Sequence, residues 1–275
     1  MRCWAASNVD SSMSFGKRLC CALILIASAC PMQAQTAAKQ DEFCTHRPPA
    51  GERPVSWKKI GPNILCDQRA IWTFPLGLAK GRNLAPTLAV VGASSGFVLL
   101  DPSYTPYFRR TESFHGFNQV LSSRNTALIV TLVPAALYGV SLLRHDSYSQ
   151  NTFLLSAEAV IGSEILGIVM KDIDRRLRPI DIPPNGNFSD TWFKSHGGYW
   201  RGSGSFPSGH ELAAISVATI LSRRYRNHRW VPWVAYGTAG LIGFSRVTLS
   251  SHFISDVVTG AALGYSVSRF AVLQQ

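Results

Sequence analysis

Long apolar runs separated by short polar segments fill the chain from residue 84 to its last residues. The runs lack the period-two alternation of half-buried strands, so each predicts a helix. Six helices are expected, at residues 84–100, 126–143, 153–170, 211–221, 230–244 and 257–273. The predicted fold class is therefore all-α, a six-helix bundle with one long active-site loop.

The scarcity of charge favours a bundle embedded in a membrane. Charged residues make up 16% of the chain and hydrophobic residues 46%, whereas soluble domains have roughly 25% charged residues. The longest runs have 17 or 18 residues, slightly fewer than the roughly 20 that a spanning helix needs. The number of spans therefore stays open, and a soluble exported globule is the alternative.

Residues 1–34 are predicted to be a signal peptide or an N-terminal anchor. Lys17 and Arg18 precede an apolar run at 19–29, and small residues follow up to Ala34, which is the order of a secretory signal. Residues 35–69 are polar and contain four prolines. They are expected to form an irregular extracytoplasmic lead-in to a helical phosphatase domain at 70–275.

The cysteines also suggest export. Of six cysteines, four lie within residues 1–34, and only Cys44 and Cys66 follow. An isolated pair in a polar stretch of an exported chain predicts one disulfide, and two free thiols are the alternative. Neither cysteine has the spacing of a zinc site, and no metal is expected.

The net charge of +11 suits anionic partners, which include nucleic acid, acidic lipid headgroups and phosphorylated small molecules. The sequence has no aromatic-plus-basic RNA-binding pattern and no basic recognition helix, so nucleic acid is not expected as a partner. A phosphorylated lipid or small-molecule phosphate is expected instead.

A stretch at 172–206, rich in proline and glycine, is long enough to predict a functional loop.

Three polar clusters carry the candidate chemistry. They are Lys171, separated by six residues from Arg178-Pro179; Pro207-Ser208-Gly209-His210; and Ser245-Arg246, separated by five residues from His252, which three further residues separate from Asp256. Ser208 and Gly209 open a predicted helix, whose unpaired N–H groups bind phosphate. Lys171, Arg178 and Arg246 add cations that match phosphate oxygens.

The two histidines suggest how a phosphoryl group would be transferred. His252 and Asp256 are four residues apart and would share one face of a helix, so the carboxylate can hold one imidazole nitrogen protonated and leave the other free to attack. His210 is then available as the general acid. The fixed cations can take the charge-neutralising role that magnesium commonly has in this chemistry. Each cluster alone also has a plain explanation as a helix cap, a solvated charge or a surface pair.

In this order and spacing, the clusters resemble the signature of the type-2 phosphatidic acid phosphatase and vanadium haloperoxidase superfamily. Every specified position of that signature is matched, and the resemblance covers roughly residues 150–275. It implies that His252 forms a phosphohistidine, that Asp256 orients it and that His210 protonates the leaving group. The residues implied to bind the phosphoryl oxygens are Lys171, Arg178, Ser208, Gly209 and Arg246. Glu211 departs from the small polar residue of many relatives.

The expected function is a cofactor-free, metal-independent hydrolase of phosphate monoesters or diphosphates, with lipids as the favoured substrates. Two alternatives are a soluble exported acid phosphatase of broad specificity and a vanadium-dependent haloperoxidase. A non-catalytic phospholipid-binding protein is a third, disfavoured because His210 and His252 are both present.

The topology contains a conflict. The connection at 222–230 carries four arginines and is predicted to be cytoplasmic by the positive-inside rule, which places His210 and Ser245 on the outer face. An exported N-terminus followed by three spanning helices would instead leave Lys171 inside. The favoured location is a bacterial inner membrane with the site facing the periplasm, and a soluble periplasmic protein is the alternative.

Overall fold

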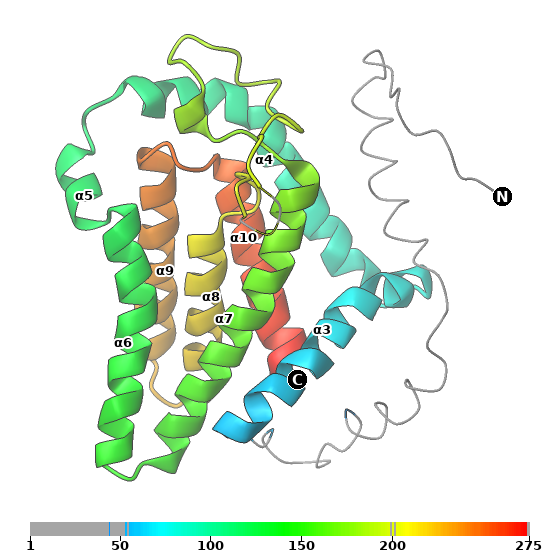
Figure 1. Ribbon diagram of the computed structural model, residues 1–275, viewed down its shortest axis with the longest axis vertical. Helices are drawn as coiled ribbons and strands as arrows, with labels where there is room; N and C mark the ends of the chain where they lie inside the picture. Colours follow the sequence, from blue (N-terminus) through cyan, green and yellow to red (C-terminus); the bar gives the residue numbers. More distant parts are fainter. Residues whose placement is uncertain (1–43, 45–52, 54, 199, 201, 274–275) are drawn as a thin grey trace. The chain divides into compact units, whose positions relative to one another are not determined.

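The computed structural model describes residues 44, 53, 55–198, 200 and 202–273 (Figure 1). The signal or anchor predicted at 1–34 lies outside the described residues, as does most of 35–54. The chain divides into two units, Met1–Arg47 and Pro48–Gln275, and all helices treated below belong to the second.

The described residues contain eight α-helices and no strand. The helices are α3 (Trp57–Ala79), α4 (Leu84–Arg110), α5 (His115–Val120), α6 (Ser123–Leu143), α7 (Ser147–Asp174), α8 (Gly209–Arg224), α9 (Val231–Thr248) and α10 (Ile254–Ser266). A 3-10 turn (Pro179–Asp181) interrupts the long loop, and a π-helical turn (Val267–Val272) follows α10. The all-α prediction is confirmed. The predicted count of six helices is wrong, because α3 and α5 are additional.

Helix α3 corrects the prediction that residues 35–69 are irregular. The chain is helical from Trp57, so the expected boundary at residue 69 falls inside α3. Polar residues of α3 pair with α7: Asn63 Nδ2 donates to Glu158 Oε1 at 2.8 Å, and Gln68 Nε2 donates to the Gly162 carbonyl at 2.8 Å. Glu158 is fully buried. The polarity of this segment therefore serves helix packing.

The cysteines of the predicted pair, Cys44 and Cys66, are each disulfide-bonded in the structure. That they bond to each other stays a prediction.

Helix α8 is the central helix of the second unit. It packs against α7, α9 and α10, and ten of its 16 residues are buried. Helix α10 approaches it closely at two glycines. A methyl group at Gly260 would lie 2.7 Å from the Ser208 carbonyl oxygen, and one at Gly264 would lie 2.4 Å from the Leu212 carbonyl oxygen. Only glycine permits this spacing at either position without a shift of backbone.

Three segments of the described chain are long and apolar enough to cross a membrane, judged by length and composition. They are Leu84–Arg110, Ser123–Leu143 and Ser147–Asp181, and only 11% of an apolar 18-residue window in each of the first two is buried. Large apolar side chains are exposed on the bundle, among them Leu99, Leu143 and Trp233. So much exposed apolar surface is typical of a lipid-facing bundle.

The order of the helices brings four of their ends together. Helices α7 and α9 run toward one end of the bundle, and α8 and α10 start there (Figure 1). Arg175 ends α7 in the left-handed conformation, with φ of 44°, which turns the chain into the loop at 175–208. All three predicted clusters therefore lie at this end.

Candidate active site

His252 lies in the short connection between α9 and α10, two residues before α10 begins. The expectation that it shares a helix with Asp256 is therefore wrong, although Asp256, in the first turn of α10, still faces it. Nδ1 of His252 lies 2.7 Å from the Ser205 carbonyl oxygen and 3.5 Å from Asp256 Oδ2. Because a carbonyl can only accept, Nδ1 carries the proton and Nε2 is left with its lone pair.

Asp256 is fully buried and accepts hydrogen bonds from three donors, two in the loop at 175–208 and one at the start of α10. Ser205 Oγ and the Phe253 backbone N–H donate to Oδ2 at 2.5 and 2.9 Å. Arg176 Nη1 donates to Oδ1 at 2.5 Å. A carboxylate with this many donors is fixed in position and kept ionised. It can therefore stabilise positive charge that develops on His252.

Arg176 connects this carboxylate to a second buried acid. Its Nη2 lies 2.7 Å from Oδ2 of Asp101 on α4, and its side chain is 1% exposed. The guanidinium also lies over the ring of Phe253, 3.9 Å from the centroid, and over that of Trp192, at 4.5 Å. Ser255 of α10 links Arg176 to Asp101 a second time, since its Oγ accepts from Arg176 Nη1 and donates to Asp101 Oδ2. The result is a continuous buried chain of charges from α4 to α10.

Two predicted phosphate-binding cations lie near His252 without a protein anion bound to them. Among the described residues, neither Lys171 Nζ nor the Arg178 guanidinium has a hydrogen bond or ion pair, although Lys171 is only 8% exposed. Both side chains act electrostatically on His252. A methyl group at Gly209 would lie 3.0 Å from Lys171 Nζ and 3.3 Å from both carboxylate oxygens of Glu164. Lys171 therefore reaches the start of α8, with Glu164 beside it.

Arg246, the third predicted cation, is fully buried and already bonded to protein. Its Nη1 donates to Ser123 Oγ at 2.9 Å, and Nη2 donates to the Leu121 carbonyl at 2.6 Å and Thr126 Oγ1 at 2.8 Å. Nε donates to Ser245 Oγ at 3.1 Å. A guanidinium has five N–H donors, so within the described residues one Nη1 hydrogen stays available for a phosphoryl oxygen.

The start of α8 matches the predicted helix N-terminus, with one difference. The Ser208 backbone N–H was expected to be open to ligand, but it donates to the Asp256 carbonyl at 3.0 Å. The Ser208 Oγ is buried and has no hydrogen-bond partner in the described structure. The donors at this terminus are therefore the hydroxyl of Ser208 and the N–H groups of the first turn of α8.

His210 lies in that first turn, with Nε2 at 3.2 Å from the Ser123 carbonyl oxygen. It is within electrostatic range of Arg246, His252 and Lys171. The next residue, Glu211, acts electrostatically on Arg246, and its carboxyl lies against α9. A methyl group at Gly243 of α9 would lie 2.5 Å from Glu211 Oε2, so the glycine makes room for the carboxyl.

Burial is the main influence on the pKa of His252 and lowers it below its ordinary value. The cations of Arg178 and Lys171 lower it further, whereas the hydrogen bond and charge of Asp256 raise it. A lowered pKa keeps the imidazole neutral near pH 7, which is the state a nucleophile requires.

Four residues of the buried polar chain around His252 were not predicted: Asp101, Arg176, Ser205 and Ser255. Asp101 had a usable signal, because an acid next to the apolar run at 84–100 needs a partner when the helix is buried or in lipid. Arg176 and Ser205 lie in the irregular loop, where no periodicity marks them. No group of three or more His, Cys, Asp or Glu residues in the described part of the chain is arranged to hold a metal ion.

Comparison with known proteins finds similarity to the same superfamily that the motifs resemble. Residues 152–275 match the family model of the PAP2 superfamily. Over 158 residues the chain is 31% identical to a lipid A 4'-phosphatase of Porphyromonas gingivalis. This alignment covers 56% of this chain and 63% of that protein. Over 108 residues it is 34% identical to a lipid A 1-phosphatase of Rhizobium etli, covering 38% and 42%.

The chain thus spans less than two thirds of the length of both curated relatives. Among solved structures, it is similar to the transmembrane PAP2 type phosphatidylglycerolphosphate phosphatase of Bacillus subtilis. The TM-score is 0.38 and the identity 23%, and the alignment covers 77% of this chain and 91% of that one.

Proposed function

We propose that this chain, whose residues 152–275 match the PAP2 superfamily, is a membrane lipid phosphatase that works through a phosphohistidine on His252. The observation that carries the proposal is the surroundings of His252. Its Nδ1 proton is held by the Ser205 carbonyl and Asp256, while the Lys171 ammonium and the Arg178 guanidinium lie nearby with no hydrogen bond or ion pair among the described residues. A nucleophile beside unpaired cations suits a substrate that is itself a phosphate anion.

In the first step, Nε2 of His252 attacks the phosphorus atom of the substrate. A P–N bond forms and the P–O bond to the lipid alcohol breaks. Burial lowers the pKa of His210 to about 4, and the charge of the bound phosphate anion favours its protonated form. The protonated His210 gives its proton to the leaving oxygen. Negative charge on the three remaining oxygens is stabilised by Lys171, Arg178 and the donors at the start of α8.

In the second step, neutral His210 takes a proton from a water molecule, whose oxygen attacks the phosphorus atom. The P–N bond breaks, inorganic phosphate leaves and His252 returns to its neutral form. Asp256 stabilises the positive charge that His252 acquires while phosphorylated. The nucleophile, the acid, the base and the cations of both steps are all side chains or backbone groups of the protein, so the proposed reaction needs no metal ion.

The proposed substrate is a lipid carrying a phosphate monoester, with lipid A as the class to test first. The names of the two curated relatives support this class. The apolar exposed surfaces of α4 and α6 support a location where such a lipid is found. The arginine-rich connection at 222–230 lies at the opposite end of α8 from His210, and by the positive-inside rule supports a site facing the periplasm.

The test is phosphate release by the purified full-length chain in detergent with EDTA present. The substrates are bisphosphorylated lipid A, a polyprenyl diphosphate and a soluble aryl phosphate. His252→Ala is expected to lower the rate at least about 1,000-fold, whereas His115→Ala, at an exposed position on α5, is the matched control and should keep it.

A preference for lipid A supports the whole proposal. Release from the aryl phosphate alone would replace it with a broad acid phosphatase. No release from any substrate, or release that survives His252→Ala, would contradict the mechanism.

A further inference from the structure

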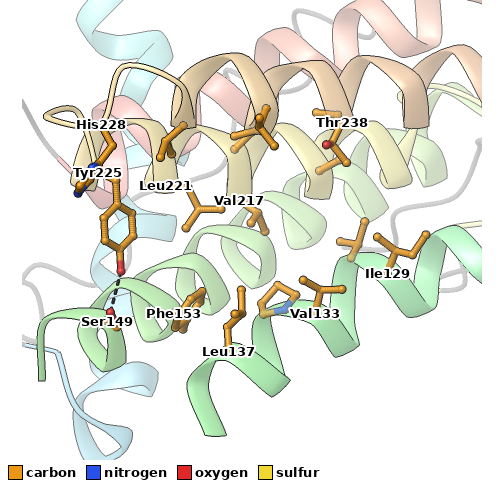
Figure 2. Close-up of a pocket in the computed structure, with 18 of the residues that line it drawn as sticks. Ile129, Val133, Leu137, Ser149, Phe153, Val217, Leu221, Tyr225, His228 and Thr238 are labelled. Carbon is orange, nitrogen blue, oxygen red and sulfur yellow. Dashed lines mark hydrogen bonds between the residues drawn. The ribbon is translucent and has the colours of Figure 1, made fainter. Parts of the chain in front are cut away.

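An open apolar groove of about 590 Å³ runs along α8, with α6 and α9 as its walls. Figure 2 shows Val133 and Leu137 of α6 facing Val217 and Leu221 of α8 across it. Val133 and Leu137 are 50% and 44% exposed. The catalytic residues described above do not line this groove, and nothing in the proposed reaction uses it.

One end of the groove is polar and aromatic. Tyr225 and His228 close it in Figure 2, where Tyr225 Oη is hydrogen-bonded to Ser149 Oγ at 2.8 Å. Trp230 also lines this end, and the neighbouring Trp233 is 82% exposed. Exposed tryptophan and tyrosine at a helix end are typical of the boundary between the hydrocarbon and headgroup layers.

The same end is strongly basic. Arg144 lines it and is exposed, and no hydrogen bond or ion pair engages its guanidinium among the described residues. The connection that follows α8 adds Arg226 and Arg229, both exposed. The acid at this end is Asp146, whose carboxylate accepts from the backbone N–H groups of Tyr148 and Ser149 and from Ser149 Oγ. Positive charge therefore dominates.

The length of the groove matches one leaflet. Along α8 it extends from Ala214 to Tyr225, which corresponds to about 16 Å at 1.5 Å per residue. Half of a bilayer's hydrocarbon core is about 15 Å thick. An acyl chain whose headgroup lies at the basic end would therefore extend along the whole groove.

We propose that the groove is a binding site for an anionic phospholipid, with one acyl chain between α6 and α9 and the headgroup phosphate at Arg144, Arg226 and Arg229. The headgroup would lie at the end of α8 away from His210, so this lipid belongs to the leaflet opposite the catalytic residues and is not the substrate. The proposal requires a membrane but does not rest on the proposed reaction.

The experiment compares dioleoylphosphatidylglycerol with dioleoylphosphatidylcholine, added to the full-length protein in detergent. Native mass spectrometry counts bound lipids, and the melting temperature is read at each lipid concentration. We expect one phosphatidylglycerol to be retained in preference to phosphatidylcholine and to raise the melting temperature. Arg144→Gln should weaken this binding about fivefold, which is the effect of roughly 1 kcal/mol per basic residue at an anionic lipid surface.

Matched variants separate the groove from the rest of the surface. Val217→Trp fills the groove and should abolish the preference, whereas Val91→Trp, at an exposed position of α4, should keep it. Arg110→Gln, on an exposed arginine at the catalytic end, is the control for Arg144→Gln. His252→Ala should bind phosphatidylglycerol as the parent protein does, which keeps this test independent of the phosphatase proposal.

Equal retention of the two lipids, or an unchanged preference in both Val217→Trp and Arg144→Gln, would overturn the proposal. A dimer that dissociates in Val217→Trp would overturn it in favour of a second copy of the chain. If Val217→Trp does not fold, the exposed Arg144→Gln change still decides the outcome.

Discussion

Arg176 and Asp256 form a buried ion pair, with Arg176 Nη1 2.5 Å from Asp256 Oδ1 and side-chain exposures of 1% and 0%. The other end of the guanidinium pairs with Asp101 of α4. One cation therefore holds two carboxylates that come from helices far apart in the sequence. Because Asp256 faces His252, the arrangement ties α4 to the position of the proposed nucleophile.

Arg176→Met is expected to lower kcat about 100-fold and to lower the free energy of unfolding by roughly 3–5 kcal/mol, because it leaves two buried carboxylates unpaired. KM should change much less, since Arg176 acts through Asp256. Steady-state kinetics and chemical denaturation measure the two effects. Arg176→Lys should restore only part of kcat, because lysine lacks the planar fork that spans both acids.

The matched control for that prediction is the neighbouring arginine. Arg175 donates to the Gly197 carbonyl in the loop, and Arg175→Met should change kcat by no more than about threefold. Removing the unpaired acid should rescue stability, so Asp101→Asn/Arg176→Met is expected to unfold less readily than Arg176→Met alone. A kcat for Arg176→Met equal to that of Arg175→Met would show that Asp256 needs no such support.

Ser205 supports His252 through two different groups. Its carbonyl accepts from His252 Nδ1 and its hydroxyl donates to Asp256. Ser205→Ala keeps the carbonyl and removes one hydrogen bond to a charged group, so kcat should fall about 10- to 100-fold. Asp256→Ala should lower kcat further than Ser205→Ala does. Equal losses in the two variants would mean that the hydroxyl, and not the carboxylate, dominates the orientation of His252.

The pH dependence follows from the lowered pKa of His252. The nucleophile must be unprotonated, so a pKa below the ordinary value of about 6.5 places the acid limb of kcat/KM below that pH. The Arg178 cation contributes to the lowering, and Arg178→Gln should therefore raise this pKa and move the acid limb to higher pH. Profiles from acidic to neutral pH measure the limb, with Arg175→Gln as the control. A limb that stays in place or moves to lower pH contradicts the assignment.

The close approach of α8 and α10 gives a prediction with an internal control. Gly260→Ala places a methyl group 2.7 Å from the Ser208 carbonyl, so it should lower the free energy of unfolding by about 1–3 kcal/mol and reduce kcat/KM by displacing Ser208. A methyl group at Gly240 of α9 would instead point into open space. Apart from its chain neighbours and the nearby backbone of α9, no described atom lies within 4 Å of it. Gly240→Ala should instead stabilise the protein by roughly 0.5–1 kcal/mol with unchanged activity. Circular dichroism melts and phosphate release distinguish the two.

Much of the fold could be predicted because apolar runs mark helices directly. All six expected runs coincide with observed helices to within one residue, and the run at 257–273 continues through the π-helical turn. Helix α3 was missed because its polar residues are used in packing: Asn63 and Gln68 bond to α7, and such pairing has no signature in one sequence. Helix α5 is too short to show a period, with six residues.

In the candidate site, too, features with a local sequence pattern could be predicted and long-range contacts could not. Local spacing predicted which residues meet at one end of the bundle, because helix order alone brings Lys171, His210 and His252 there. It could not predict that Ser205 lies closer to His252 Nδ1 than Asp256 does, since that depends on the path of the loop. The pairing of Asp101 with Arg176 spans 75 residues, and no local pattern connects them.

The central claim is tested most directly by trapping the phosphorylated enzyme. The purified protein would be mixed with substrate labelled with ³²P in the scissile phosphate and quenched with alkali within milliseconds, because a phosphohistidine survives alkali and is lost in acid. The account predicts base-stable, acid-labile label that maps to the peptide containing His252 and is absent from His252→Ala. Label on another residue, or rapid phosphate release with no labelled protein at any time, would contradict it.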